Sequence, residues 1–276
     1  MSKENDKCTV AVIMSVYHKD DPLALYEALQ SLINQTYCCD IFVYIDGLVP
    51  DSLNSVLDDF KSTRGVRLFS SENNQGLAVA LNYLIDQVMS MNYQFIARMD
   101  SDDVCYPNRI AKQIEFLERN NDVDVLGSNC REFGADFALS EKSLPKSHEQ
   151  LIDFSIVRCP FIHPTVMFRS RVFSDKSIRY PTDTALTEDM ALWFLLLVND
   201  FKFANLSETL LDYRLNEATL SRRRGFAKSM SEVKMRFHYM GRLKRYSLRN
   251  IAGVLTRLVF HVMPISLVRL AYRHMR

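Results

Sequence analysis

The sequence lacks the short motifs that mark several common classes of enzyme. No G-x-G-x-x-G follows the first apolar run and no G-x-x-x-x-G-K-[ST] occurs anywhere, which disfavours dinucleotide and P-loop sites of those types. The six cysteines form no C-x-x-C pair, so we expect no zinc site and predict reduced, mostly buried thiols of a cytoplasmic protein. Internal repeats, low-complexity segments and linkers rich in proline or glycine are absent as well.

Long hydrophobic runs are also missing. The N-terminus, MSKENDKC, is polar, and the run VAVIMSV that follows is too short for the core of a signal peptide or for a membrane span. With 47% hydrophobic and 24% charged residues the chain can still bury a sizeable core, which excludes disorder. Its 276 residues predict one large domain, or one domain with an extension.

Acidic residues are nearly absent from the last part of the chain. From Arg222 onwards there are 14 Lys and Arg residues against one acid, Glu232, which leaves 20 basic and 32 acidic residues before Arg222. The net charge of +1 therefore combines an acidic body with a basic tail. Such a tail indicates contact with an anionic surface, either a membrane or a nucleic acid.

The first half of the chain contains a regular alternation of strand and helix patterns. Continuous apolar, β-branched runs predict strands, and apolar residues at helical spacing predict helices between them. This alternation indicates an α/β fold with a mostly parallel sheet flanked by helices, because parallel neighbours need crossover connections. Strands are expected at 10–16, 41–45, 66–69 and 95–99, with helices from Pro22, over 53–60 and over 77–88; the less regular second half predicts a loop into a strand at 159–168, a helix at 187–198, a strand at 210–215 and basic helices after 226.

Polar side chains follow each of the first four strands. Ser15, Asp46 and Asn74 come at or soon after the ends of the first three, and Asp100 and Asp102 follow the fourth. In open parallel sheets the ligand lies outside the carboxyl ends of the strands. We therefore expect these side chains to gather at one edge of the sheet as a ligand site.

The segment ARMDSDDVCYPNR crowds three aspartates, Asp100, Asp102 and Asp103, into four positions. Like charges at this spacing repel, so something must offset the repulsion. Two carboxylates at a strand end can hold Mg²⁺ or Mn²⁺ and leave coordination sites open for a phosphate-bearing ligand. The alternative is that an aspartate caps the helix expected near Pro107, and for Asp103 alone this is the favoured interpretation.

Four further features have both a functional and a structural interpretation. Asp46 either accepts a hydrogen bond from a nucleobase or opens a turn. Glu188 and Asp189 begin a predicted helix. Either one of them is a general base that the helix N-terminus keeps ionised, or both simply complement the helix dipole. His163 is either functional or a satisfied structural histidine. The run Arg222–Arg224 is either a clamp on phosphate oxygens or a solvated turn.

An ordered set of segments carries a resemblance that no single motif would. These are VIMSVYHKD, LQSLINQTY, IDG, NNQGLAVALN, ARMDSDD with PNR, HPTVMFR, TEDMALW and LLDYRL, which together extend from about residue 10 to 224. In this order they resemble the inverting family 2 glycosyltransferases with the GT-A fold. More narrowly, they are similar to bacterial enzymes that build O-antigen and capsule repeat units on a lipid carrier.

The resemblance implies a UDP-sugar donor, a Mn²⁺ or Mg²⁺ cofactor and a lipid-linked acceptor. Asp102 would bind the metal directly, with Asp100 as the other member of the D-x-D pair. Asp189 would be the catalytic base, with Glu188 beside it. The implied nucleotide-sugar site comprises Ser15, Tyr17, Asp46, Asn74, Gly76, Asp100, Asp102, Arg222, Arg223 and Arg224, and the acceptor side comprises His163 and Trp193.

Two positions depart from the family pattern. The turn after the second strand usually carries two acids before glycine, and here Ile45 replaces the first. The family's Tyr-Arg-x-His has Asn216 where the histidine helps to hold metal or diphosphate. These departures weaken the implied base recognition and metal affinity, and they favour one alternative, a catalytically silent nucleotide-binding or scaffold protein. A peripheral membrane binding protein is the other.

The expected organisation is a catalytic domain over 1–225, with a nucleotide-sugar half over 8–130 and an acceptor half over 131–225, followed by a basic tail over 226–276. The tail is predicted to be an amphipathic helix on an anionic membrane, which suits an undecaprenyl-diphosphate-linked acceptor and a peripheral position on the inner face of the cell membrane. Packing of the tail on the acidic body is the alternative, and few aromatics accompany its charges, so no nucleic-acid partner is expected. Its apolar face comprises Leu248, Ile251, Ala252, Leu255, Leu258, Val259 and Val262.

Overall fold

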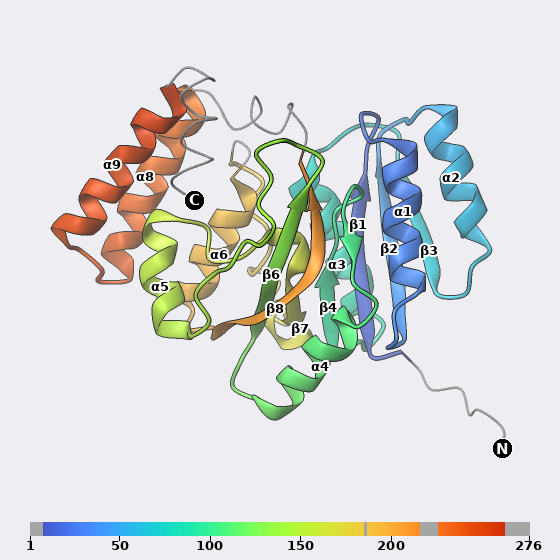
Figure 1. Cartoon of the computed structure of the whole chain (residues 1–276), viewed down its shortest axis with the longest axis horizontal. Helices are drawn as coiled ribbons and strands as arrows, with labels where there is room; N and C mark the ends of the chain where they lie inside the picture. The colour runs from blue at the N-terminus through green and yellow to red at the C-terminus, as the bar shows by residue number, and fades with distance from the viewer. Residues whose placement is uncertain (1–7, 185–186, 216–225, 263–276) are drawn as a thin grey trace.

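The computed structural model describes residues 8–184, 187–215 and 226–262, which are arranged around one sheet (Figure 1). Within these residues the sheet has eight strands in the order β3-β2-β1-β4-β7-β6-β8-β5. The strands are β1 (Val10–Val16), β2 (Cys39–Asp46), β3 (Val66–Ser71), β4 (Phe95–Arg98), β5 (Val104–Cys105), β6 (Val125–Phe133), β7 (Met167–Arg169) and β8 (Phe203–Arg214). The helices are α1 (Pro22–Ile33), α2 (Asp51–Lys61), α3 (Leu77–Met89), α4 (Arg109–Arg119), α5 (His148–Val157), α6 (Glu188–Val198), α8 (Phe226–Arg242) and α9 (Leu248–Val262).

The predicted parallel half of the sheet is confirmed. Strands β3, β2, β1 and β4 pair in parallel, so their carboxyl ends lie together at the upper edge of the sheet in Figure 1. Strand β7 is antiparallel to β4 and β6, whereas β6 and β8 are parallel. The main body is therefore the expected α/β fold with a mostly parallel sheet.

Both faces of the sheet are covered, as the continuous apolar runs predict. Ala11 and Ile13 of β1 belong to the core layer that contains residues of α3 and α6. Val12 and Met14 belong to the opposite layer, with residues of α1 and α4. All four side chains are completely buried, as expected for a strand whose alternate residues face two covering layers.

Strand β6 and helix α5 were not predicted from the sequence. The β6 segment VLGSNCREF contains polar residues that obscure the strand pattern, yet Ser128 and Asn129 are buried. Their hydrogen bonds come from segments distant in the chain: the Ser128 amide donates to Thr165 Oγ1 at 3.1 Å, and Asn129 Nδ2 donates to the Ser207 carbonyl at 3.0 Å. Buried polar groups are tolerated in a strand when they are paired in this way.

The expectation of six reduced cysteines was wrong for one pair. Cys8 and Cys38 form a disulfide with Cα atoms 5.4 Å apart, and Cys39, Cys105, Cys130 and Cys159 are free. The two residues are 30 positions apart, but parallel pairing of β1 with β2 brings the starts of these strands together. Spacing along the chain therefore gave no indication of this pairing.

The two basic helices α8 and α9 pack against each other and against α5 and α6 (Figure 1). Arg236 of α8 is 1% exposed and its Nε donates to Glu232 Oε1 at 2.9 Å. Its Nη1 donates to the carbonyls of Ser155 and Ile156 on α5, at 2.8 and 2.9 Å. Within the described ranges, no helix is both long and apolar enough to cross a bilayer.

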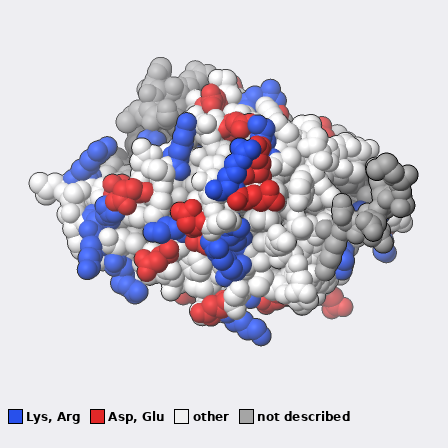
Figure 2. Space-filling view, turned by 90° about the horizontal axis from the view of Figure 1, so that it is seen from below, with Lys and Arg blue, Asp and Glu red and all other residues white. Residues whose placement is uncertain are grey.

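Surface charges of α5 reinforce this packing. Arg245, in the turn before α9, forms ion pairs with Glu149 and Asp153 of α5. Figure 2 shows the face opposite the carboxyl ends of the strands, where basic and acidic side chains are interspersed, including at the end of the molecule formed by α8 and α9. Part of the basic charge of the tail is therefore used to hold it on the body, as the packing alternative predicts.

Replacing Arg236 by alanine should destabilise the fold strongly. The substitution takes the arginine partner from buried Glu232 and a donor from two carbonyls of α5, and breaking a buried ion pair costs about 3–5 kcal/mol. Urea unfolding measures the loss. Lys234→Ala on the exposed side of the same helix is the control and should change stability by no more than ~0.5 kcal/mol. Equal stability of the two variants would contradict the structural role of Arg236.

Candidate functional site

Asp46 and the loop before α3 form one wall of the candidate site. The side chain of Asp46 is 3% exposed, and its two carboxylate oxygens accept the amides of Gln75 and Gly76 at 2.7 and 2.9 Å. Asn74 Nδ2 donates to the Asp46 carbonyl at 3.1 Å. Gly47 has φ +89°, and a Cβ there would lie 2.9 Å from the Asn74 amide nitrogen, so the close approach of the two loops requires glycine.

The predicted aspartates lie in a turn between β4 and β5. Asp100 is paired with Arg98, which is 1% exposed, and Asp102 is only partly buried. Asp20, at the end of the loop after β1, approaches the same turn and accepts a hydrogen bond from Ser101 Oγ at 2.8 Å. The ends of β1 and β4 therefore meet around this turn, as the sheet topology requires.

The favoured interpretation of Asp103 as a helix cap was wrong. Helix α4 begins after Asn108, and the completely buried Asp103 instead accepts the backbone amide of Arg214 on Oδ1 at 2.8 Å. Its Oδ2 has no hydrogen-bond partner among the described residues. Asp103 therefore links the turn to the end of β8 through a buried hydrogen bond.

The electrostatics of the turn fit a hard divalent cation. One carboxylate oxygen from each of Asp100, Asp102 and Asp103 lies within 4.8 Å of the others. Burial, together with repulsion from the carboxylates of Asp100 and Asp20, raises the pKa of Asp102 to about 7. Oxygen ligands at this spacing are those that Mg²⁺ and Mn²⁺ use, and a cation would offset the repulsion. The acidic cluster is therefore compatible with a D-x-D metal site.

His163 is hydrogen-bonded to Tyr180. The His163 Nε2 lies 2.9 Å from the Tyr180 hydroxyl, and burial holds the pKa of His163 well below its usual range, with the charge of Arg98 adding to the effect. The imidazole is therefore neutral at pH 7. It is a partly buried, hydrogen-bonded histidine, which is the structural interpretation, and its partner is the buried Tyr180.

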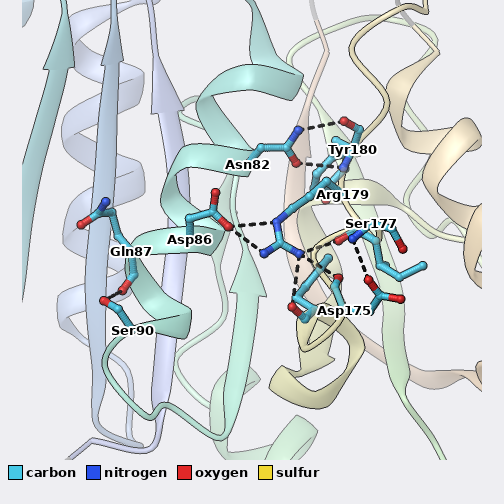
Figure 3. A network of polar contacts seen from close by, with 10 residues as sticks. Asn82, Asp86, Gln87, Ser90, Asp175, Ser177, Arg179 and Tyr180 are labelled. Carbon is cyan, nitrogen blue, oxygen red and sulfur yellow. Dashed lines mark hydrogen bonds and ion pairs between the residues drawn. The ribbon is translucent and has the colours of Figure 1, made fainter.

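The position of Tyr180 is held by helix α3 (Figure 3). The side chain of Asn82 forms two hydrogen bonds of 2.8 Å with the Tyr180 backbone, one to its amide and one to its carbonyl. The neighbouring Arg179 donates to Asp86 from Nε and Nη2 at 3.0 and 2.7 Å. The segment that contains Arg179 and Tyr180, from the second half of the chain, is thereby fixed on helix α3 of the first half.

The two predicted acidic groups converge on Tyr180. Burial raises the pKa of its hydroxyl; Arg98 opposes this shift, and the carboxylates of Asp189, Asp100 and Glu188 add to it. These charges therefore act on one tyrosine, although they come from the D-S-D turn and from the start of α6. The fold thus brings the D-x-D acids and the Glu-Asp pair within electrostatic range of the same residue.

Asp189 is held at the N-terminus of α6. Its Oδ1 accepts its neighbour's amide, from Met190, at 2.7 Å, and Cys159 Sγ lies 3.8 Å from its Oδ2. Burial raises the pKa of Cys159 to about 12, so this group is a thiol that can donate weakly to the carboxylate. Glu188 and Asp189 are both partly buried at a helix start, where ionised carboxylates are favoured.

Trp193 lies behind the site rather than in it. Its side chain is 0% exposed and packs against Phe161, Phe168 and Phe203 at ring-centroid distances of 4.9–6.3 Å, with His163 at 6.0 Å. A tryptophan without exposed surface has no face for an acceptor. This position corrects the expectation of direct acceptor contact. Trp193 instead packs behind His163 in the core.

Several site residues were not singled out from the sequence. Arg98, Asp20 and Arg214 lie in the segments ARMDSDD, VIMSVYHKD and LLDYRL, but no role was predicted for them or for Tyr180. Asp20, Tyr180 and Arg214 contact partners far away in the chain, whereas Arg98 pairs with Asp100, two residues later. A signal was present for Arg98, because a charged residue near the end of an apolar run requires a buried partner. The predicted Arg222–Arg224 and Asn216 lie outside the described residues.

Asp102→Asn should stabilise the metal-free protein at pH 7.5. The folded pKa of Asp102 is raised from 3.8 to about 7, so its stabilising contribution is present at low pH and is lost as the pH rises through 7. Asparagine removes the repulsion, and we expect a gain of about 1–2 kcal/mol after allowance for solvent screening.

Thermal or urea unfolding at pH 5 and pH 7.5, with and without Mn²⁺, measures this effect. The wild type should be stabilised by Mn²⁺ at pH 7.5 and the variant should not, because the metal requires the ionised carboxylate. A variant that is less stable than the wild type without metal at pH 7.5 would contradict the electrostatic account of the turn.

The sequence is similar to a known family and to curated relatives. A family model described as Glycosyl transferase family 2 matches residues 11–176. The chain is 33% identical over 267 residues to the Escherichia coli UDP-Gal:alpha-D-GlcNAc-diphosphoundecaprenol beta-1,3-galactosyltransferase, covering 95% of this chain and 94% of that protein. It is 30% identical over 264 residues to the amylovoran biosynthesis glycosyltransferase AmsE of Erwinia amylovora, covering 95% and 97%.

Solved structures show the same fold at low sequence identity. The S. aureus TarS 1–349 structure in complex with UDP aligns with a TM-score of 0.61 at 15% identity, covering 96% of this chain and 87% of that one. The mannosyltransferase PcManGT from Pyrobaculum calidifontis, in complex with GDP-Man and Mn²⁺, aligns with a TM-score of 0.62 at 14% identity, covering 98% and 86%. The chain belongs to glycosyl transferase family 2 and has the GT-A fold.

Proposed function

We propose that this glycosyltransferase moves a hexose, galactose or glucose, from a UDP-sugar to a sugar carried on a lipid diphosphate during assembly of a bacterial surface polysaccharide such as O-antigen. One observation carries the proposal. The acids of the D-S-D turn and of the α6 N-terminus both raise the pKa of the same buried tyrosine, Tyr180, in a chain that is similar over 95% of its length to a galactosyltransferase with a diphosphoundecaprenol-linked acceptor.

The donor nucleotide would lie at the carboxyl ends of β1, β2 and β3. Asp46 and Ser15 would contact the uridine, with Tyr17, Asn74 and Gly76 lining the same site. Each Asp46 oxygen already accepts an amide from the loop before α3, but a carboxylate oxygen has a further lone pair for a base N–H. This arrangement supports base recognition by one acid although Ile45 replaces the other. The arginines Arg222, Arg223 and Arg224 would lie near the diphosphate.

Asp102, with Asp100 beside it, would hold Mn²⁺ or Mg²⁺. A divalent cation bound there would stabilise negative charge on the leaving UDP. Asp100 is paired with Arg98, and Asp103 is completely buried and accepts the backbone amide of Arg214, whereas Asp102 is only partly buried and forms no ion pair in the described structure. This difference supports Asp102 as the main ligand.

Asp189 would act as the general base. The oxygen of an acceptor hydroxyl attacks the anomeric carbon, the bond from that carbon to the UDP oxygen breaks, and Asp189 takes the hydroxyl proton. A single displacement from the face opposite the leaving group inverts the anomeric configuration. The start of α6 favours the ionised carboxylate that this role requires. Neutral His163, backed by Tyr180, would bind on the acceptor side.

The tail would place the enzyme on the inner face of the membrane, where its acceptor is anchored. Helix α9 packs inward through Ile251 and Val254, whereas Leu248 is 88% exposed and Leu255 47% exposed, with Ala252 between them on the same side. Exposed basic residues, including Lys244 and Arg249, flank this stripe. An apolar stripe with flanking cations fits an anionic bilayer surface.

The first experiment is UDP release from a panel of UDP-sugars. The acceptor would be a diphosphate-lipid analogue carrying GlcNAc or GalNAc, with Mn²⁺ or with EDTA. Release that needs the acceptor, the metal and one particular sugar supports the transferase and identifies its donor. Absence of release across the panel would overturn the proposal and favour a silent nucleotide-binding or scaffold protein.

Asp189→Asn should reduce turnover by about 10²–10⁴-fold, the usual contribution of a general base, because asparagine cannot take the acceptor proton. Binding of the UDP-sugar should be preserved, since Asp189 lies on α6 and the nucleotide site lies at the ends of β1 to β3. Steady-state UDP release and calorimetric UDP-sugar binding measure the two effects. Turnover close to that of the wild type would remove Asp189 from this role.

Replacing Leu248 and Leu255 together by glutamine should weaken binding to phosphatidylglycerol vesicles by at least about tenfold, because two exposed apolar side chains are lost from the contact. Cosedimentation measures the binding, and phosphatidylcholine vesicles test the dependence on charge. Ile33→Gln, at an exposed apolar position on α1, is the matched control. Turnover of a water-soluble acceptor analogue should be unchanged in all three proteins. Vesicle binding equal to the wild type would exclude this stripe as the membrane contact.

A further inference from the structure

Arg214, the last residue of β8, contacts the D-S-D-D turn at two separate points. Its backbone amide donates to Asp103 Oδ1 at 2.8 Å, and its side-chain Nε donates to the backbone carbonyl of Asp102 at 2.7 Å. The first bond holds the carboxylate next to the proposed metal ligand, and the second holds the main chain of that ligand itself.

The guanidinium of Arg214 is itself fixed from two other elements. Its Nη2 is paired with Glu27 on α1, and its Cζ lies 4.5 Å from the centroid of the Phe133 ring at the end of β6. A planar group with donors in different directions can make the Glu27 and Asp102 contacts together while stacking on an aromatic ring, and the point charge of lysine cannot. Arg214 therefore connects α1, β6 and β8 to one turn.

The turn needs such support because little regular structure restrains it. Strand β5, which follows it, has two residues, and it pairs with β8 through Val104 with Asp212 and Cys105 with Leu211. The carboxylates of Asp100, Asp102 and Asp103 lie close together and repel one another. Without the Arg214 side chain, a rotation of the turn that separates these groups would relieve the repulsion.

We propose that Arg214 is a positioning residue that holds the backbone of Asp102 in the geometry required for binding a divalent cation. The residue does not touch the substrate. It acts through the carbonyl of Asp102, with Glu27 and Phe133 fixing the direction of its guanidinium. The metal-binding part of this inference rests on the proposed function.

A neighbouring arginine provides a matched control. Arg131 on β6 is ion-paired with Asp212, two residues before Arg214 on β8, and its side chain is 52% exposed. None of its described hydrogen bonds or ion pairs reaches the D-S-D-D turn. Its removal deletes an arginine–carboxylate pair from the same strand and leaves the contacts of the turn intact.

The experiment compares Arg214→Met, Arg214→Lys and Arg131→Met with the full-length wild type. Methionine keeps the backbone bond to Asp103 and removes only the side-chain bonds. The first readout is hydrogen–deuterium exchange in metal-free protein, followed in peptides that cover residues 99–106. The second is the affinity for Mn²⁺ in the presence of UDP, measured from the electron paramagnetic resonance signal of free Mn²⁺. Thermal unfolding reports global stability.

We expect exchange in the turn to accelerate about fivefold in Arg214→Met, because one hydrogen bond is lost locally. The dissociation constant for Mn²⁺ should rise about 10- to 100-fold, the range for groups that orient a metal ligand. Arg214→Lys should recover part of both losses, and Arg131→Met should match the wild type in both. Glu27→Gln, which loosens the guanidinium but keeps its Nε, should give a smaller effect and serves if Arg214→Met fails to fold.

Two results would overturn the inference. One is exchange in the turn and Mn²⁺ affinity within twofold of the wild type in Arg214→Met, or in Glu27→Gln if that is the variant that folds. The other is equal losses in Arg131→Met, which would show general stabilisation by the strand. Hydrogen–deuterium exchange is measured without metal, so it tests whether Arg214 stabilises the turn independently of metal binding. A wild type that fails to bind Mn²⁺ would count against the proposed function and against the metal-binding part of this inference.

Discussion

Repulsion among carboxylates at the end of β4 is the constraint on which the rest of this site depends. Asp100, Asp102 and Asp103 lie close together, and burial strengthens their repulsion because the interior screens charge poorly. Two arginines contact the turn from opposite directions. Arg98 pairs with Asp100 from the core beneath the turn, and Arg214 donates to the Asp102 carbonyl from the end of β8. Neither cation forms a described ion pair with Asp102, whose pKa is raised. Asp100 is the one member of the three that forms a described ion pair with an arginine, so the cluster keeps negative charge that a bound cation would compensate.

The site also depends on a physical connection between the two halves of the chain. Asn82 of α3 holds the backbone of Tyr180 with two hydrogen bonds, so the segment around Tyr180, beyond β7, is held on a helix of the first half of the chain. The Tyr180 hydroxyl then reaches His163, and its surroundings include charges from both the D-S-D turn and α6. A displacement of this segment would therefore move the hydrogen-bond partner of His163 relative to both groups of acids.

The parts of this structure that were predictable from the sequence are those determined by local pattern. The strands of the parallel half are continuous apolar runs, and the rule that ligands lie at the carboxyl ends of such strands placed Asp46 and Asp102 correctly at one edge. The parts that were missed depend on distant partners. Asp103 looked like a helix cap because only its neighbours in the sequence were visible, whereas its partner is the amide of Arg214, 111 residues later. The disulfide between Cys8 and Cys38 likewise follows from the pairing of β1 with β2 and not from any cysteine motif.

The tail illustrates how one amphipathic pattern can serve two contacts. Sequence periodicity treats the apolar face of α9 as a single surface, but packing divides it: Ile251 and Val254 face the protein, whereas Leu248 and Leu255 face outward. The buried Arg236 of α8 ties the same helix pair to the carbonyls of α5. Because the pair packs on α5 and α6, any surface that the outward stripe binds would set the orientation of the main body relative to that surface. A basic tail without this packing would hold the protein near an anionic surface without orienting it.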